Sequence, residues 1–120
     1  MSEDSRAWGL WDRTGASSVP GIVSFDEQAG VLWVAGDEDR ATAGCRRRPI
    51  STALRAGRDV LVDLRELRFA DSSLVVDLAV LAQHLRREGR QLRLYAPQPH
   101  VQRLFEAAGL HRLPAVAFEG

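Results

Sequence analysis

The stretch Asp63-Leu-Arg-Glu-Leu-Arg-Phe-Ala-Asp-Ser-Ser-Leu74 decides the fold of this chain, because it joins two elements of different type. Just before its start, Val60-Leu61-Val62 forms a continuous apolar run bounded by charge, which is typical of a strand buried on both faces. After it, Ser72–Glu88 has the spacing of a helix that packs one face on a core, with leucines at positions 74, 78, 81 and 85. Asp71 is placed to cap the first turn of that helix. The stretch therefore predicts a buried strand, a connection and a long helix that opens with two serines.

Toward the N-terminus, two apolar segments and an arginine-rich segment come before this stretch. Gly21–Phe25 and Val31–Ala35 are separated by a short polar loop, and this pattern indicates a β-hairpin. Arg40–Ala56 is rich in arginine and carries scattered apolar residues, but Pro49 lies inside it and has no N–H to donate. We therefore expect a helix that begins near Pro49, or is kinked there, and that ends at Gly57.

Toward the C-terminus, the alternation of strand and helix continues. Gln91–Ala96 predicts a strand, Pro99–Ala108 an amphipathic helix that Gly109 stops, and Pro114–Phe118 a short edge strand. The predicted order is β-β-α-β-α-β-α-(β). This order indicates the α/β class, with a mixed sheet, right-handed crossovers and helices packed against the sheet.

The bulk composition favours one soluble domain. At 120 residues with a formal net charge of +0, the chain has no global field that would draw it to nucleic acid or to an anionic membrane. No apolar run approaches the roughly 20 residues needed to cross a bilayer, and no signal peptide precedes the domain, so we expect a cytoplasmic protein. We assign residues 1–19 to a flexible leader, in which Trp8 and Trp11 are unusual, and residues 20–120 to the domain.

The sequence gives little support to catalysis. It has neither a glycine-rich phosphate loop nor a nucleophile elbow, and its three histidines fall on different predicted elements. Cys45 is the single cysteine, so no disulfide framework or sulfur-rich metal site is expected. The Arg46-Arg47-Arg48 run is too short for a nucleic-acid site and is interpreted as a solvated helix face. We predict a protein that is not an enzyme and that needs no cofactor and no metal.

Ser72 and Ser73 are the most informative polar residues. Backbone N–H groups at the start of a helix have no partner within the helix, and that end of the helix dipole is positive. A phosphoryl group on Ser72 would be stabilised there while adding about −1.5 to −2 charges at pH 7. From the residues alone, plain capping by Asp71 is the alternative interpretation.

Four segments, in this order, resemble the STAS domain, a family named for sulfate transporters and anti-sigma factor antagonists. They are Gly36-Asp37-Glu38-Asp39 with Ala41-Thr42-Ala43, Val60-Leu61-Val62-Asp63-Leu64, Phe69-Ala70-Asp71-Ser72-Ser73, and Val101–Leu110. The resemblance spans about residues 21–118. It implies a STAS-like α/β fold, in which a mixed sheet of four to five strands packs against three to four α-helices.

The resemblance also implies a function, that of a stand-alone bacterial anti-sigma factor antagonist. In such proteins the serine after the motif aspartate, here Ser72, is phosphorylated by an anti-sigma factor with serine kinase activity. The unmodified form binds the kinase and frees the sigma factor for transcription, and the phosphorylated form lets go. A weak homodimer is compatible with this role. The implied partner-binding residues are Asp37, Asp39, Asp71, Ser72, Ser73, Leu74 and Asp77.

Departures from the family pattern keep other functions open. Leu74 stands where the family has glycine, Val76 occupies a second small position, and Asp77 and Glu38 replace apolar residues. Asp77 is also one turn from Ser73 and is expected to hydrogen-bond it. Leu74 and Asp77 favour an unswitched STAS scaffold, or an accessory subunit of a signalling or transport complex. A third possibility, an enzyme or small-ligand binder, would need a site built from Cys45 and the arginines or from the aspartates.

Overall fold

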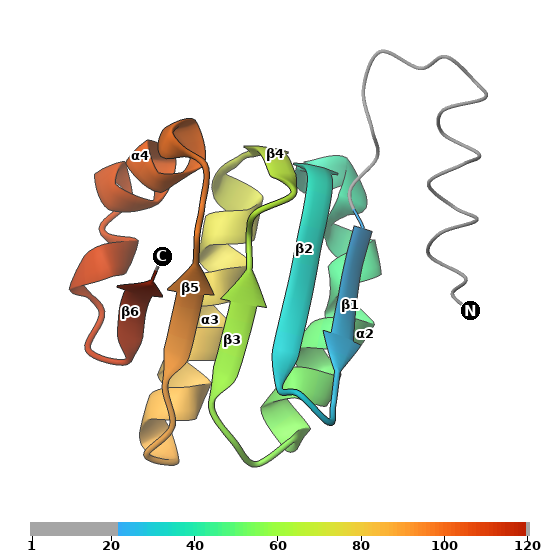
Figure 1. Ribbon diagram of the computed structural model, residues 1–120, viewed down its shortest axis with the longest axis vertical. Coiled ribbons are helices and arrows are strands. Elements are labelled where there is room, and N and C mark those ends of the chain that lie inside the picture. The colour runs from blue at the N-terminus through green and yellow to red at the C-terminus, as the bar shows by residue number, and fades with distance from the viewer. Residues whose placement is uncertain (1–21, 120) are drawn as a thin grey trace.

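The structure, a computed structural model, describes residues 22–119 (Figure 1). The predicted leader, with Trp8 and Trp11, lies outside the described residues. The elements follow one another as β1 (Ile22–Asp26), β2 (Val31–Glu38), the 3-10 turn η1 (Arg40–Thr42), α2 (Ala43–Arg55), β3 (Val60–Asp63), β4 (Leu67–Ala70), α3 (Ser72–Arg87), β5 (Leu92–Tyr95), α4 (Pro99–Ala107), the 3-10 turn η2 (Leu110–Arg112) and β6 (Val116–Glu119).

The strands form one mixed sheet in the order β1-β2-β3-β5-β6, and β4 pairs with the end of β2. β1 and β2 form the predicted antiparallel hairpin, whereas β2, β3, β5 and β6 are parallel neighbours. In Figure 1, α2 lies behind β1 and β2, and α3 lies behind β3 and β5, so both helices cover the same face of the sheet. The α/β class, the mixed sheet and the edge position of the last strand are confirmed.

The sheet has six strands, one more than the four to five expected, because Leu67–Ala70 forms β4. This strand pairs in parallel with β2, with Gly36 opposite Leu67 and Glu38 opposite Ala70. Its two ends are buried and its two middle residues are exposed, so it shows neither the alternation nor the continuous apolar run by which strands are predicted. β4 lies beside the end of β2 and ends two residues before the start of α3.

A helix start near Pro49, one of the two alternatives expected there, is wrong. α2 begins six residues earlier, at Ala43, and continues through Pro49 to Arg55. The turn η1 leads directly into α2 and is held by a capping box. The Asp39 side chain accepts hydrogen bonds from the N–H groups of Ala41 and Thr42, and the Thr42 hydroxyl accepts one from the Asp39 N–H. The predicted stop at Gly57 is confirmed, because that residue has a φ of +72°, which favours glycine.

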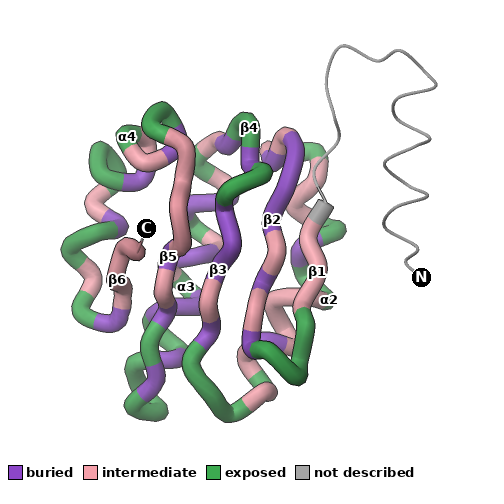
Figure 2. The backbone as a smooth tube through the Cα atoms, in the orientation of Figure 1, coloured by how far each residue is buried: buried purple, intermediate pink, exposed green. Residues whose placement is uncertain are grey.

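The core lies between the sheet and the two helices, as the purple segments of Figure 2 indicate. The predicted leucine stripe of α3 is buried in it, together with residues of the central strands and of α4, among them Val34, Val62, Leu94, Val101 and Phe105. Among residues 22–119, no helix is both long enough and apolar enough to span a bilayer.

Candidate functional site

The start of α3 is tied to the end of β2 by the residue that caps it. Asp71 has an extended backbone, and its Oδ1 accepts the Ser73 N–H at 2.9 Å, which confirms the predicted N-cap. Its Oδ2 accepts the backbone N–H of Arg40 at 3.1 Å, and its own N–H donates to the Glu38 carbonyl. One aspartate therefore holds the first turn of α3 against both β2 and η1.

The two serines that follow have different environments. The Ser73 hydroxyl donates to Asp71 Oδ1 at 2.6 Å and accepts from Arg46 Nη2 at 3.0 Å, and the residue is half-buried. Ser72 is exposed, and within residues 22–119 its hydroxyl has no hydrogen-bond partner. The hydroxyl that is free to react is therefore that of Ser72.

Arg46 is the structural centre of the site, and its expected place on a solvated helix face is wrong. The side chain is 1% exposed and is the largest of the fully buried side chains among the described residues. Its Nη1 donates to Glu38 Oε1 at 2.7 Å, and its Nε donates to Asp77 Oδ2 at 2.9 Å. Consecutive residues of a helix point about 100° apart, so Arg46 faces inward while Arg47 and Arg48 remain exposed.

The same guanidinium replaces the direct hydrogen bond expected between Asp77 and Ser73. Arg46 contacts both side chains, and it thereby joins β2, α2 and α3 in one polar cluster, Glu38–Arg46–Asp77–Ser73. Sequence reasoning missed this cluster. The available signal was a pair of acids, Glu38 and Asp77, at positions where apolar residues are the rule, with an arginine run between them.

The charges of the cluster are set by burial and hydrogen bonding. Burial raises the pKa of Glu38 above its ordinary value, against the hydrogen bond and the charge of Arg46, which lower it. Burial acts to lower the pKa of Arg46, but its hydrogen bonds with Glu38 and Asp77 raise it overall, so the guanidinium stays charged. The hydrogen bond from the Ser73 hydroxyl lowers the pKa of Asp71, so its carboxylate is ionised beside Ser72 at neutral pH.

The remaining predicted partner-binding residues are placed as follows. Asp39 caps η1, and its carbonyl accepts from Arg46 at 3.3 Å, so it adjoins the cluster. Asp37 is half-buried in β2, opposite the exposed Phe69 of β4. Leu74 is 1% exposed and packs in the core, so its side chain is not accessible at the surface of this structure. The structure thus brings Asp39, Asp71, Ser73 and Asp77 together around Ser72 and Arg46.

An exposed apolar face lies beside Ser72 and was not predicted. Val76 is 57% exposed and Val80 is 47% exposed, and they follow Ser72 at intervals of four residues, so all three share one side of α3. Phe69, 51% exposed, lies on β4 just before the helix. Exposed apolar side chains grouped in this way are typical of surfaces on which proteins dock.

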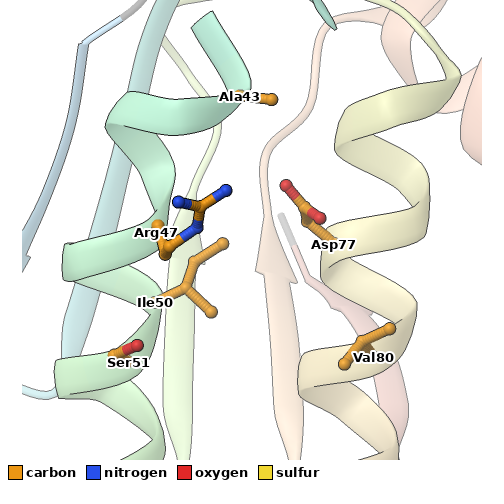
Figure 3. Close-up of a pocket in the computed structure, with 6 residues that line it drawn as sticks. All are labelled: Ala43, Arg47, Ile50, Ser51, Asp77 and Val80. Atoms are coloured by element: carbon orange, nitrogen blue, oxygen red, sulfur yellow. The ribbon is translucent and has the colours of Figure 1, made fainter.

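A groove of about 240 Å³ runs between α2 and α3 beside this face, and it is lined by Ala43, Arg47, Ile50, Ser51, Asp77 and Val80. Figure 3 shows Arg47 and Asp77 pointing into the space between the helices from opposite sides. Within residues 22–119, no group of three histidine, cysteine, aspartate or glutamate side chains has an arrangement that would hold a metal ion. The site offers an exposed hydroxyl, an apolar stripe and a groove, which together suit the docking of a protein.

Comparison with known proteins agrees with this geometry. A family model described as "Mlab, STAS domain" matches residues 22–115. No curated protein sequence matches the chain significantly.

Three solved structures share the fold. A putative anti-sigma factor antagonist from Thermotoga maritima superposes with a TM-score of 0.64 at 13% identity, covering 83% of this chain and 86% of that one. An anti-sigma-factor antagonist (STAS) domain protein from Planctomyces limnophilus gives 0.63 at 14% identity, with 83% and 90% covered. The anti-sigma factor antagonist SpoIIAA in its unphosphorylated form gives 0.55 at 19% identity, with 78% and 96% covered.

Proposed function

This chain belongs to the STAS domain family, and on that premise we propose that it is an anti-sigma factor antagonist controlled by phosphorylation of Ser72. In its unmodified form it binds an anti-sigma factor with serine kinase activity and so releases a sigma factor for transcription. It has no catalytic activity of its own in this scheme. The observation that carries the proposal is the contrast between Ser72, which is exposed and unbonded, and Ser73, which is held by Asp71 and Arg46.

Phosphorylation at this position would change the surface without changing the fold. Ser72 makes no core contact, and the positive end of the α3 dipole stabilises a phosphoryl group on it. The modified serine would add about −1.5 to −2 charges next to the ionised Asp71 and beside the apolar Val76. A partner that packs on Val76 would have to desolvate this charge, which costs several kcal/mol if the charge stays unpaired. A loss of about 2.7 kcal/mol corresponds to a hundredfold weaker complex.

The proposal is tested with the anti-sigma factor that co-purifies with this protein from its native cells, identified by mass spectrometry and then purified. Ser72→Ala is expected to bind it as the wild type does and to remain bound after ATP is added. Ser72→Glu is expected to bind at least tenfold more weakly in calorimetry. Gln83→Glu is the matched control, because it adds the same charge to an exposed position of α3 eleven residues away and should leave affinity unchanged. Equal affinities for wild type and Ser72→Glu, or no phosphate on Ser72 after incubation with ATP, would contradict the proposal.

A second function is favoured by the size of the apolar face. Val76 and Val80 remain exposed whether or not Ser72 is modified, and such a surface also suits an unswitched STAS scaffold or an accessory subunit of a signalling or transport complex. That role predicts a stable complex that ATP does not dissociate, and protein from native cells that carries no phosphoserine.

A further inference from the structure

We infer that the groove between α2 and α3 receives an acidic amphipathic helix of the partner protein. This inference rests on the proposed function in one respect, that the surface around Ser72 is covered by a protein. Beyond the proposed function, the inference states which kind of segment the partner inserts, namely a helix with an apolar face and acidic flanks.

The shape of the groove suits a helix better than a small molecule. Its volume of about 240 Å³ is below the range of roughly 300–1,000 Å³ that is usual for ligand pockets. Its walls are two helices, and its apolar lining comes from Ala43 and Ile50 of α2 and Val80 of α3. A helix laid along such a groove inserts apolar side chains spaced three and four residues apart, a common mode of peptide recognition.

The α2 side of the groove is positively charged and favours an acidic occupant, whereas the acid on its α3 side, Asp77, is already paired with Arg46. α2 carries four arginines and no acidic residue. Arg46 is neutralised by the buried cluster, but Arg47, Arg48 and Arg55 are exposed, and within residues 22–119 none of them has an ion-pair partner. These three arginines also line an adjoining hollow on α2. The hollow and the groove have two lining residues in common, Arg47 and Ser51. Carboxylates along one flank of a docked helix would meet this row of cations.

The groove is continuous with the surface around Ser72. At 1.5 Å per residue, Val80 lies about 12 Å from Ser72 along α3, with Val76 between them. An interface of ordinary size buries about 800 Å² on each partner, so one protein can cover both places. The two places are nevertheless electrostatically separate at the Val80 end of the groove. A charge on Ser72 is more than a Debye length of about 8 Å from Val80, so the groove should bind its helix whether or not Ser72 is charged.

The test uses two synthetic 16-residue peptides and the full chain, with binding followed by fluorescence anisotropy. Both peptides have leucines spaced three and four residues apart. One carries glutamates on its polar flank, and the other carries lysines at the same positions. The glutamate peptide is expected to bind the wild type at least tenfold more tightly than the lysine peptide, with the difference shrinking as salt is raised. NMR should show the largest methyl shifts at Ile50 and Val80.

Reversing the charge of the arginines beside the groove tests whether they select the acidic peptide. Arg47→Glu/Arg48→Glu should weaken the glutamate peptide at least tenfold and should bind the lysine peptide instead. Arg103→Glu/Arg112→Glu is the matched control, since it makes the same change in net charge at exposed arginines of α4 and η2 and should leave both peptides unaffected. Equal binding of the two peptides to the wild type, or unchanged binding by Arg47→Glu/Arg48→Glu, overturns the inference.

Ser72→Glu separates this inference from the proposed function. It is expected to bind the glutamate peptide as tightly as the wild type does, although it loses the anti-sigma factor. If the peptide results are as expected but the anti-sigma factor binds Ser72→Glu as it binds the wild type, the proposed control by Ser72 is refuted and the inference about the groove is retained. If Ser72→Glu releases the anti-sigma factor but the wild type binds both peptides equally, the inference about the groove is refuted and the proposed control by Ser72 is retained.

Discussion

Replacement of Arg46 by methionine removes a guanidinium that contacts Glu38, Asp77 and Ser73 at once. Methionine is flexible and unbranched, so it fills most of the space that the arginine stem occupies and limits the cavity that results. What remains is Glu38, 1% exposed and without its counter-charge. Its Oε2 already has no hydrogen-bond partner among the described residues, so the loss of Arg46 leaves a buried carboxylate without a counter-charge.

The size of the effect follows from that burial. Removing one partner of a buried ion pair costs about 3–5 kcal/mol, and the pair with Asp77, whose side chain is 37% exposed, adds little because solvent screens it. A domain of this size has about 5–15 kcal/mol of stability in total. At about 4–8 °C for each kcal/mol, the midpoint of thermal unfolding should fall by roughly 12–40 °C.

The loss should depend on pH. Burial raises the pKa of Glu38, and Arg46 opposes that rise, so removing Arg46 moves the pKa higher still. A carboxyl whose pKa is raised in the folded state destabilises that state as pH increases from its unfolded value, near 4.5, through its folded value. The stability gap between the wild type and Arg46→Met should therefore be widest near neutral pH and should narrow as the pH is lowered toward 5.

Urea unfolding followed by circular dichroism at pH 7.5 and pH 5 measures both effects. Arg47→Met is the matched control, since the neighbouring arginine is exposed and its replacement should change stability by no more than about 0.5 kcal/mol. The double variant Glu38→Met/Arg46→Met should recover most of the loss, because a buried ion pair replaced by apolar residues is often neutral. The reasoning is refuted if Arg46→Met is as stable as Arg47→Met, or if the double variant is less stable than Arg46→Met alone.

Two further predictions concern the start of α3. Asp71→Ala should cost about 1 kcal/mol of stability at pH 7, because the N-cap hydrogen bond to Ser73 is lost. The hydrogen bonds from the Ser73 hydroxyl and, to a lesser degree, the Ser73 N–H lower the pKa of Asp71, so their contribution is present above the unfolded value near 3.8 and disappears as pH falls through the lower folded value; the thermal midpoints of wild type and variant should therefore converge in strong acid. Leu74→Ala should lower the unfolding free energy by about 2–5 kcal/mol in urea, as expected for a buried leucine; a stable variant with weakened partner binding would instead place Leu74 on the interface.

Periodicity was sufficient to predict most of the fold and failed where elements are short or interrupted. The leucine stripe of α3 and the apolar run of β3 carry enough residues to reveal which face is buried. β4 has four residues, and its pairing with β2 depends on a chain segment 31 to 32 residues earlier. The start of α2 was misplaced because a proline inside a helix is usually excluded, whereas here the capping box of Asp39 and Thr42 begins the helix well before Pro49.

The misplaced helix start explains why the cluster around Arg46 could not be predicted. The three consecutive arginines are chemically identical, and only the phase of the helix decides which of them points inward. That phase is set by the start of α2 at Ala43. A helix that begins near Pro49, or is kinked there, does not fix this phase, and without it the whole arginine run is interpreted as a solvated helix face. The cap at Asp71 and the two serines were predictable, because they depend only on residues next to one another in the chain.

The position of Arg46 also changes the meaning of the departures from the family pattern. Glu38 and Asp77 both meet this one guanidinium, so two replacements of apolar residues by acids are compensated by a single arginine. Leu74 points into the core. Three of the departures are therefore either buried or paired with Arg46, and the charge beside the Ser72 hydroxyl is set by Asp71 and by any group attached to Ser72 itself. Val76 is the departure that remains on the exposed face, so it is the residue through which this chain would distinguish its own partner from those of its relatives.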